Sequence, residues 1–406
     1  MLTEKYQNEK RKLYLVSIEN LLAWIITGMT SIAYVSVINS IYEEDLSKAS
    51  LFYGIVEAIY CLGQAFGNCF LGVFSDKFGR KNTFIIVLAG FGLDYLICSY
   101  TSSKFLIGLA RFIDGLCAAN PQTGSSYISD ISSIDKFANN MGIFHAFGGG
   151  GILIGFGFGF LFTSIGISPR GILKISFLII IIDLIFVIFS LPESKTMLDT
   201  VEFDWSRAHP IGAFRYFKER PFLKNYLWLL FLNIMAAGCT IVVSQFYLKL
   251  RFNLSGSTIY ALLLWCAIWQ ILAMGVALKI LIQKYGNRKS LILGFVATFS
   301  ANFAFIVAWN LWIIIIGTLG VIGIIAFTII QSFFKDETPE NEHGTLFGYL
   351  SFASNISHMI TKYFYSYSFS YFTSGKLNLP QIPYFFASLF ALVAIRFAMN
   401  LPDDKI

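Results

Sequence analysis

Charged side chains are scarce in this sequence, and their scarcity excludes an ordinary soluble protein. Only 13% of the 406 residues are Asp, Glu, Lys or Arg, whereas 56% are hydrophobic. A soluble domain carries about a quarter charged residues. The apolar residues form many runs of roughly 18–25 residues, the length at which a helix crosses the hydrocarbon core of a bilayer. Short alternating segments, which a membrane β-barrel needs, are absent. We therefore expect an all-α polytopic membrane protein.

Cysteine is also sparse, and motifs for metal or nucleotide chemistry are missing. The six cysteines fall inside apolar runs without metal-ligand spacing. The glycine row from Gly148 to Gly159 is not followed by Lys-Ser/Thr, so it does not predict a phosphate loop. Its small residues are expected instead to pack closely against a helix of the other half of the chain. Without a nucleophile, metal cluster or cofactor motif, we expect neither an enzyme nor a cofactor.

Twelve membrane spans can be placed along the chain, and a polar link divides them six and six. The expected spans lie near 13–38, 50–73, 82–101, 104–127, 139–163, 170–191, 222–247, 257–282, 289–308, 310–333, 344–370 and 380–401. The link at 192–221 predicts two pseudo-symmetric six-helix bundles, over 1–191 and 222–406. Phe78-Gly79-Arg80-Lys81 is echoed by Tyr285-Gly286-Asn287-Arg288-Lys289, about half the chain later. Repeated halves with a polar site between them are a recurring plan of transporters.

Lys and Arg predict the orientation in the membrane. Most of those outside the spans fall on the side of the N-terminus, which the positive-inside rule assigns to the cytoplasm. Both termini are then cytoplasmic, in a membrane that the sequence leaves open. The net charge of +6 follows from this retention and does not indicate binding to nucleic acid.

One short charged turn, Gly72 to Lys81, lies on that side between two apolar runs. Gly72 would allow a close helix approach, Gly79 permits a left-handed turn, and Asp76 can pair with Arg80. Contacts that form in one conformation and break in another would make this turn a latch. The latch residues are Gly72, Asp76, Gly79, Arg80 and Lys81. The alternative is a plain cytoplasmic turn whose charges only set the topology.

Three charged residues lie within expected spans and form a second candidate site. At 1.5 Å per residue, Asp94 and Arg111 come to similar depths, so they can form an ion pair. Asp114 lies one helical turn from Arg111 on the same face. Such a cluster could hold a proton whose position depends on conformation. The alternative is a static buried ion pair that determines helix packing.

Uncharged and acidic groups elsewhere in the spans could line a solute cavity. The substrate-cavity candidates are Glu57, Gln64, Asn233 and Asn355. Glu57 could instead lie in the outer vestibule, and the amide side chains could form interhelical hydrogen bonds. Glu19 and Asp183 are nearer the cytoplasmic ends, where snorkelling toward water is the simpler interpretation. Lys362 is expected at the outer boundary.

The pattern Gly72-x-x-x-Asp76-Lys77-x-Gly79-Arg80-Lys81 resembles the signature loop of the major facilitator superfamily. Within that superfamily, the first half is similar to the tetracycline-type drug:proton antiporters at Tyr53-Gly54, Gln64, Asp94-Tyr95, Arg111 and Tyr127-Ile128-x-Asp130. The resemblance implies twelve helices, alternating access, and a contact between Asp76 and the start of the eleventh helix near Gly344. The antiporter glycine motif of the fifth helix lacks its proline, which is Phe156 here, and the ninth helix has Asn302 and no acid. Tetracycline itself is therefore not expected as a substrate.

These observations predict a monomeric secondary transporter in a lipid bilayer that moves a small organic solute or drug, with protons as counter-ions in an antiport. The alternative is a uniporter or symporter for a metabolite such as a sugar, amino acid or organic anion. A receptor or scaffold that no longer transports would not need a latch. A channel is disfavoured because no charged ring or filter sequence is present.

Overall fold

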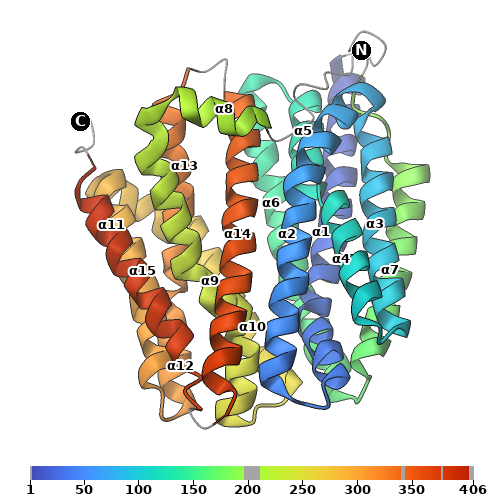
Figure 1. Cartoon of the computed structure of the whole chain (residues 1–406). Coiled ribbons are helices and arrows are strands. Elements are labelled where there is room, and N and C mark those ends of the chain that lie inside the picture. Colours follow the sequence, from blue (N-terminus) through green and yellow to red (C-terminus); the bar gives the residue numbers. More distant parts are fainter. Residues whose placement is uncertain (1, 196–210, 340–342, 376–377, 402–406) are drawn as a thin grey trace. The chain divides into compact units, whose positions relative to one another are not determined.

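The computed structural model describes residues 2–195, 211–339, 343–375 and 378–401, and within these ranges it is built of helices without strands (Figure 1). By length and hydropathy, nine segments of the described residues can cross a membrane. The expected all-α polytopic membrane fold is confirmed.

The helices follow the apolar runs of the sequence closely. The first half of the chain contains α1 (Leu2–Ile41), α2 (Leu46–Phe78), α3 (Arg80–Tyr100), α4 (Lys104–Cys117), α5 (Asn120–Ile131), α6 (Ile134–Ser164) and α7 (Pro169–Ser190). The second half contains α8 (Ile211–Glu219), the 3-10 turn η1 (Pro221–Leu223), α9 (Lys224–Phe252), α10 (Gly256–Leu272), the π-helical η2 (Ala273–Ala277), α11 (Leu278–Val307), α12 (Leu311–Gly317), the 3-10 segment η3 (Thr318–Ile324), α13 (Ile325–Asp336), α14 (His343–Thr373) and α15 (Ile382–Met399).

Several of the twelve expected spans take a different form from a single apolar helix. The fourth is broken into α4 and α5 at Ala118 and Ala119. The eighth and ninth form one run, Gly256–Val307, which turns at Gly286 with φ 76°. The eleventh, α14, is rich in Tyr and Ser and is not among the nine apolar segments.

Contacts group the chain into two compact units, and the tip of the α1–α2 hairpin belongs to the second. Unit 1 contains residues 1–37 and 59–212, and unit 2 contains 38–58 and 213–406. This tip belongs to unit 2 because it packs on α14: Ser47 Oγ donates to the Ser370 carbonyl at 2.8 Å. Residues 196–210 of the link lie outside the described ranges, so the bundle boundary at 192–221 stays a prediction.

Unit 1 has a core to which six helices contribute. α3 packs along α4 and α7, and buried side chains of α1, α5 and α6 join them. These side chains include Val16, Phe84, Tyr127, Phe144 and Val187. Because lipid is as apolar as these side chains, close van der Waals packing stabilises helix association here more than transfer out of water does.

Unit 2 is organised around α9, which packs against α14 and α15. Aromatic hydroxyls tie these helices to carbonyl groups: Tyr365 Oη donates to Met235 O at 2.6 Å, and Tyr247 Oη donates to Phe305 O at 2.7 Å. The Phe305 ring stacks on Tyr384 with a centroid distance of 4.4 Å. The hydroxyls of Tyr365 and Tyr247 each have an acceptor, so these two buried tyrosines add packing without leaving a polar group unsatisfied.

Large apolar side chains cover the outside of the helices. Phe189 is 82% exposed, Phe105 is 76% exposed and Trp309 is 75% exposed. An integral membrane protein turns such side chains toward lipid, where they carry no cost of hydration.

The glycine row of α6 packs on α1 of the same unit, which corrects the expectation of a partner in the other half. A Cβ atom on Gly155 would lie 2.3 Å from the Ile25 carbonyl oxygen and 3.0 Å from the Gly28 Cα. A Cβ on Gly151 would lie 2.5 Å from the Leu21 carbonyl oxygen. Small residues at these positions allow the two backbones to touch. Gly157, in contrast, has no such neighbour within 4 Å.

We predict that Gly155→Ala destabilises the protein, whereas Gly157→Ala does not. Both changes raise helix propensity equally, but only the first forces a methyl group into the backbone of α1. Overpacking of this kind costs about 1–3 kcal/mol. Thermal unfolding of both variants in detergent measures the difference. Equal melting temperatures would contradict the α1–α6 contact.

Candidate functional site

The charged turn between α2 and α3 is reduced to a single non-helical residue, Gly79. It has φ 97° and ψ 158°, a conformation that residues with a side chain rarely adopt; the positive φ fits the predicted need for glycine, but the extended ψ differs from a left-handed helical turn. A Cβ at this position would also lie 2.4 Å from Glu193 Oε2. Gly79 is therefore required both for its backbone angle and for the space that the Glu193 carboxylate occupies.

The Glu193 carboxylate closes the start of α3. It accepts hydrogen bonds from the Arg80 amide at 3.0 Å and the Lys81 amide at 3.1 Å. It also accepts from the amides of Ser194 and Lys195. A carboxylate at the N-terminus of a helix satisfies orphan amides and interacts favourably with the helix dipole. The residues that follow α7 are thereby attached to the α2–α3 junction.

Arg80 is the centre of the polar network at this junction. Its guanidinium contacts Asp76 Oδ1 at 2.9 Å, Asp130 Oδ2 at 2.9 Å and Ser75 Oγ at 2.8 Å. The expected Asp76–Arg80 pair is confirmed, and Arg80 is 7% exposed. Through these contacts Arg80 joins α2, α3 and α5.

Two further contacts reinforce the network from the segment after α7. Ser194 Oγ donates to Asp130 Oδ2 at 2.8 Å, and Lys195 Nζ lies 3.6 Å from Asp76 Oδ1. The Lys81 side chain, by contrast, donates to the Ile188 carbonyl at 2.7 Å, while its backbone amide is the group that binds the Glu193 carboxylate. Asp76 remains 52% exposed despite its two bases.

Gly72 does not make the close helix contact that the sequence predicted. A Cβ at Gly72 would meet no atom within 4 Å. The described neighbours of α2 leave this side of the helix open in the present conformation, so steric crowding does not explain the glycine here.

The Asp94, Arg111 and Asp114 side chains meet inside unit 1, as their depths predicted. Arg111 Nη1 lies 3.2 Å from Asp94 Oδ2 and 2.5 Å from Asp114 Oδ2. Asp94 is 0% exposed and Asp114 is 4% exposed. The guanidinium also lies over the rings of Tyr34 and Tyr60, at 4.8 and 4.4 Å from their centroids.

The surroundings of this cluster are polar as well as aromatic. Cys98 Sγ donates to Asp94 Oδ1 at 3.3 Å. Tyr95 Oη and Thr30 Oγ1 are 3.2 Å apart. One Arg thus faces two buried carboxylates among hydroxyl, thiol and ring groups of α1, α2 and α3, an arrangement in which a proton has several possible acceptors.

Glu57, a cavity candidate, forms a buried ion pair in unit 2. Lys362 Nζ lies 2.6 Å from Glu57 Oε2, and the two side chains are 16% and 9% exposed. The pair links the first part of α2 to α14. Lys362 is therefore an internal partner of Glu57, where the sequence suggested only a residue at the outer boundary.

The other cavity candidates lie in different environments. Gln64 is half-buried on α2, whereas Asn233 of α9 and Asn355 of α14 are each 7% exposed. The Asn355 Nδ2 atom has no hydrogen-bond acceptor among the described residues. The role of these three amides in binding stays a prediction.

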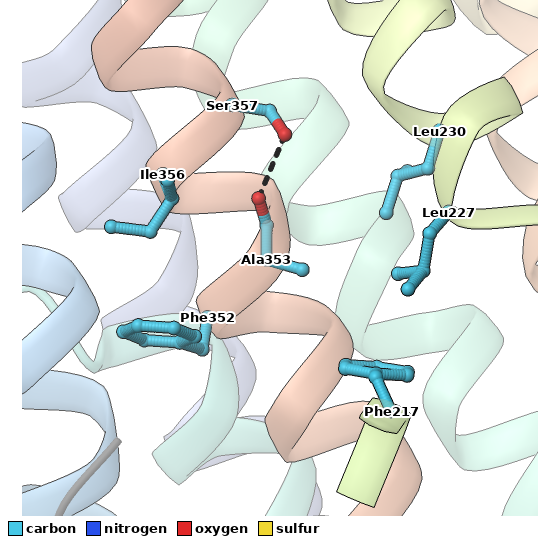
Figure 2. A pocket seen from close by; sticks show the side chains of 7 residues that line it. All are labelled: Phe217, Leu227, Leu230, Phe352, Ala353, Ile356 and Ser357. Atoms are coloured by element: carbon cyan, nitrogen blue, oxygen red, sulfur yellow. Dashed lines mark hydrogen bonds between the residues drawn. The ribbon is translucent and has the colours of Figure 1, made fainter. Parts of the chain in front are cut away.

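A cavity of about 250 Å³ lies within unit 2 between α8, α9 and α14. Figure 2 shows the lining residues Phe217, Leu227, Leu230, Phe352, Ala353, Ile356 and Ser357. Ser357 contributes the hydroxyl group of this lining, and it already donates to the Ala353 carbonyl at 2.8 Å (Figure 2). The cavity therefore offers an apolar surface to a ligand, and the four cavity candidates do not line it.

Sequence reasoning missed the importance of Asp130, Glu193 and the pair Glu19–Asp183. Glu19 and Asp183 are each 0% exposed, so they do not snorkel toward water. Asp130 was visible only as part of a family pattern, and Glu193 only as one charge of a polar link. One sequence feature does point to Glu193: it directly follows an apolar run, at the point where the chain leaves the membrane.

The fold and these buried charges define a polytopic helical membrane protein with an ordered polar junction at one end of unit 1. The family model "Major Facilitator Superfamily" matches residues 21–361. Because the match covers most of the sequence, the chain belongs to the Major Facilitator Superfamily, and it is a membrane transporter and not an enzyme.

Individual relatives agree with this assignment. The chain is 26% identical to the class B tetracycline resistance protein of Escherichia coli over 330 residues, which cover 79% of each protein. It is 23% identical to the class H tetracycline resistance protein of Pasteurella multocida over 382 residues, 90% of this chain and 89% of that protein.

Solved structures show the same fold at low sequence identity. A variant of the nucleoside transporter NupG has a structure similar to this chain, with a TM-score of 0.80 at 14% identity. The similarity covers 96% of this chain and 99% of that one. A D-xylose-proton symporter has a TM-score of 0.74 at 13% identity, covering 97% and 98%. These two likenesses describe the fold and leave the solute open.

We predict that Glu57 and Lys362 are energetically coupled. Removing either charge alone, by Glu57→Gln or Lys362→Met, leaves its buried partner without the opposite charge, a change that typically costs about 3–5 kcal/mol. The double variant should be more stable than the sum of the single effects implies.

The measurement is a double-mutant cycle from thermal or denaturant unfolding in detergent. Asp45→Asn is the control, because Asp45 pairs with Lys48 at an exposed position and should have little effect. Additive effects of the Glu57 and Lys362 substitutions would show that the two charges do not support each other.

Proposed function

We propose that the protein is a secondary transporter that exports a small, largely apolar organic solute in exchange for protons, by alternating access. The observation that carries the coupling is the buried Asp94–Arg111–Asp114 cluster. Similarity to the two tetracycline resistance proteins supports the direction and the class of solute.

The coupling follows from the charge of the cluster. Two carboxylates and one guanidinium carry a net negative charge in a region of low dielectric, where an unbalanced charge is costly. Uptake of one proton would neutralise the cluster, and it would release one carboxylate from Arg111. A transporter that exposes the cluster to one side at a time would thereby carry a proton with each cycle.

The junction around Arg80 is proposed as the latch of one conformation. Asp76 is half-exposed and already held by Arg80 and Lys195, so its second oxygen is available to a group outside this network. By the family resemblance, that group is the N-terminal end of α14, near Gly344. The open side of Gly72 would receive a neighbouring helix in that conformation, which would explain why a small residue stands there.

The charge distribution supports an orientation with this junction and both termini in the cytoplasm. Lys12, Lys81 and Lys195 all gather at the junction, where Lys12 Nζ donates to the Glu193 carbonyl at 3.1 Å.

The apolar cavity supports an amphipathic or lipophilic solute over a sugar or nucleoside. Hydroxyl-rich solutes lose hydrogen bonds to water on binding, and a site must supply partners for them. The lining in Figure 2 supplies aromatic and aliphatic surface instead. The alternative, a uniporter or symporter for a metabolite, would require the polar groups Gln64, Asn233 or Asn355 to form the binding site.

We predict that a pH gradient drives ethidium transport in proteoliposomes, and that Asp94→Asn or Asp114→Asn abolishes this dependence. Each substitution removes a proton acceptor while keeping the shape of the side chain. Xylose and uridine serve as parallel probes of the alternative. Asp45→Asn, in an exposed turn, is the control.

Gradient-driven ethidium transport by both variants at the wild-type rate would show that protons do not use this cluster. Transport of xylose or uridine in place of ethidium would favour the metabolite transporter.

We also predict that Gly72→Leu leaves thermal stability unchanged but abolishes transport. The side chain has room in the present conformation, since a Cβ meets nothing within 4 Å, but it would block the helix approach that the latch requires. Gly157→Leu, at another open glycine, is the matched control and should transport normally. Normal transport by Gly72→Leu would remove the steric argument for the latch.

A further inference from the structure

A second acidic pair, Glu19 of α1 and Asp183 of α7, lies inside unit 1 in a markedly different setting from the Asp94 cluster. Both side chains are 0% exposed. The two carboxylates have four buried oxygens, and within the described residues no basic side chain pairs with them. Val16 of α1 and Ile180 and Val187 of α7, each about one helical turn from one of the acids, belong to the same buried cluster, and the two carboxyls interact electrostatically.

The third member of this site is Asn120, the first residue of α5. Its side chain lies beside the Glu19 carboxyl group, and it is 5% exposed. Its Oδ1 atom also lacks a hydrogen-bond donor among the described residues. The chain therefore brings two buried carboxyl groups and one amide together from three helices, without a basic side chain beside them in the described residues.

The pair is separate from the cluster around Arg111. On α1, Glu19 precedes Thr30, which contacts Tyr95, by roughly 16 Å along the helix axis. One helical turn from the acidic pair, the neighbours on its own helices are apolar: Val16, Ile180 and Val187 belong to the buried core. The acidic pair is therefore surrounded on its own helices by apolar side chains.

The titratable groups on the helices around the pair are engaged elsewhere or face away. Lys12 donates to the Glu193 carbonyl, and Arg80 binds Asp76 and Asp130. Tyr127 donates to the Pro192 carbonyl at 2.7 Å. His145 of α6 is exposed. In the described residues these groups leave the two carboxyls without a compensating cation.

Two unpaired carboxylates cannot both stay ionised in such a place. Burying one unpaired charge is costly, and two like charges side by side repel as well. One negative charge is better tolerated, because Asn120 begins α5 and the N-terminus of a helix carries a partial positive charge. A single proton on the pair removes the second charge and supplies the missing donor.

We propose that Glu19 and Asp183 form a proton-binding site that holds one proton in this conformation. The proton forms an O–H bond with one carboxylate oxygen and is donated in a hydrogen bond to an oxygen of the other carboxyl or of Asn120. Its release to water, when a conformational change admits water, restores two carboxylates. The part that this site would play in transport rests on the proposed antiport. Proton binding at the site does not depend on that proposal.

A metal ion fits the site less well than a proton. Divalent cations prefer six or more oxygen ligands, or His and Cys donors. Among the described residues no group of three or more His, Cys, Asp or Glu side chains is placed to bind a metal. A proton needs only the two carboxyl groups that are present.

The test is infrared spectroscopy of the full-length protein in lipid nanodiscs at neutral pH. A protonated carboxyl group has a carbonyl band that shifts in heavy water. The wild type should show this band. In the double variant Glu19→Gln/Asp183→Asn, its intensity should fall by the amount that one protonated carboxyl group per protein molecule contributes. The control Asp45→Asn should keep the full intensity.

Thermal stability gives a second readout that does not require the spectrum. At alkaline pH the wild type should lose its proton and be destabilised, whereas the double variant, with neutral amides, should show a smaller loss between neutral and alkaline pH. This readout also reports that the double variant is folded.

Three results would overturn the inference. The first is an unchanged carbonyl band in the folded double variant, and the second is an equal alkaline loss of stability in both proteins. The third is the loss of the wild-type band when choline chloride is replaced by sodium chloride, which would assign the site to Na⁺. If ethidium transport proves independent of pH while the band behaves as expected, the antiport proposal fails and the proton site stands.

Discussion

The guanidinium group of Arg80 joins three helices of unit 1, and the arrangement of the junction depends on it. It is almost fully buried, so its charge must be balanced where it lies. Asp76 supplies one carboxylate from α2, and Asp130 supplies another from α5. Glu193 then closes the start of α3 by accepting from two of its amides. The charges of this short segment hold the ends of α2, α3, α5 and α7 together in a region where hydrophobic transfer contributes little.

Close backbone contact is the second constraint on unit 1. α1 and α6 approach until carbonyl and Cα atoms touch, and only glycine leaves room at Gly28, Gly151 and Gly155. The same logic operates between α2 and α4, where a Cβ on Gly115 would lie 2.2 Å from the Tyr60 carbonyl oxygen. Dispersion forces at these contacts replace the hydrophobic effect that would hold a soluble bundle together.

The buried acidic groups of unit 1 fall into three electrostatic classes. Around Arg80, each carboxylate has a base or several amide donors. Around Arg111, two carboxylates share one cation. At Glu19 and Asp183, two carboxyls share none. A fully compensated network is suited to hold one conformation, whereas groups with too little positive charge are suited to bind protons. This difference in charge balance is the physical reason for proposing a latch around Arg80, and proton binding around Arg111 and at Glu19 and Asp183.

The sequence by itself determined the membrane fold and those contacts that are local or depend only on depth. Hydropathy identified the spans, Gly79 identified the turn with a positive φ, and the i, i+4 spacing identified the Asp76–Arg80 pair. Helical rise was sufficient to bring Asp94 and Arg111 together, because depth in a bilayer can be counted from the ends of a span.

Only the tertiary structure decided which faces of the helices meet. The rotation of each helix about its axis, which hydropathy leaves open when a helix is apolar all round, turned the α6 glycines toward α1 and left Gly72 open. The same rotations paired Glu57 with Lys362, brought Glu193 to the start of α3, and enclosed Glu19 with Asp183. These partners are separated by more than a hundred residues, and their meeting depends on packing of side chains that a one-dimensional pattern does not encode.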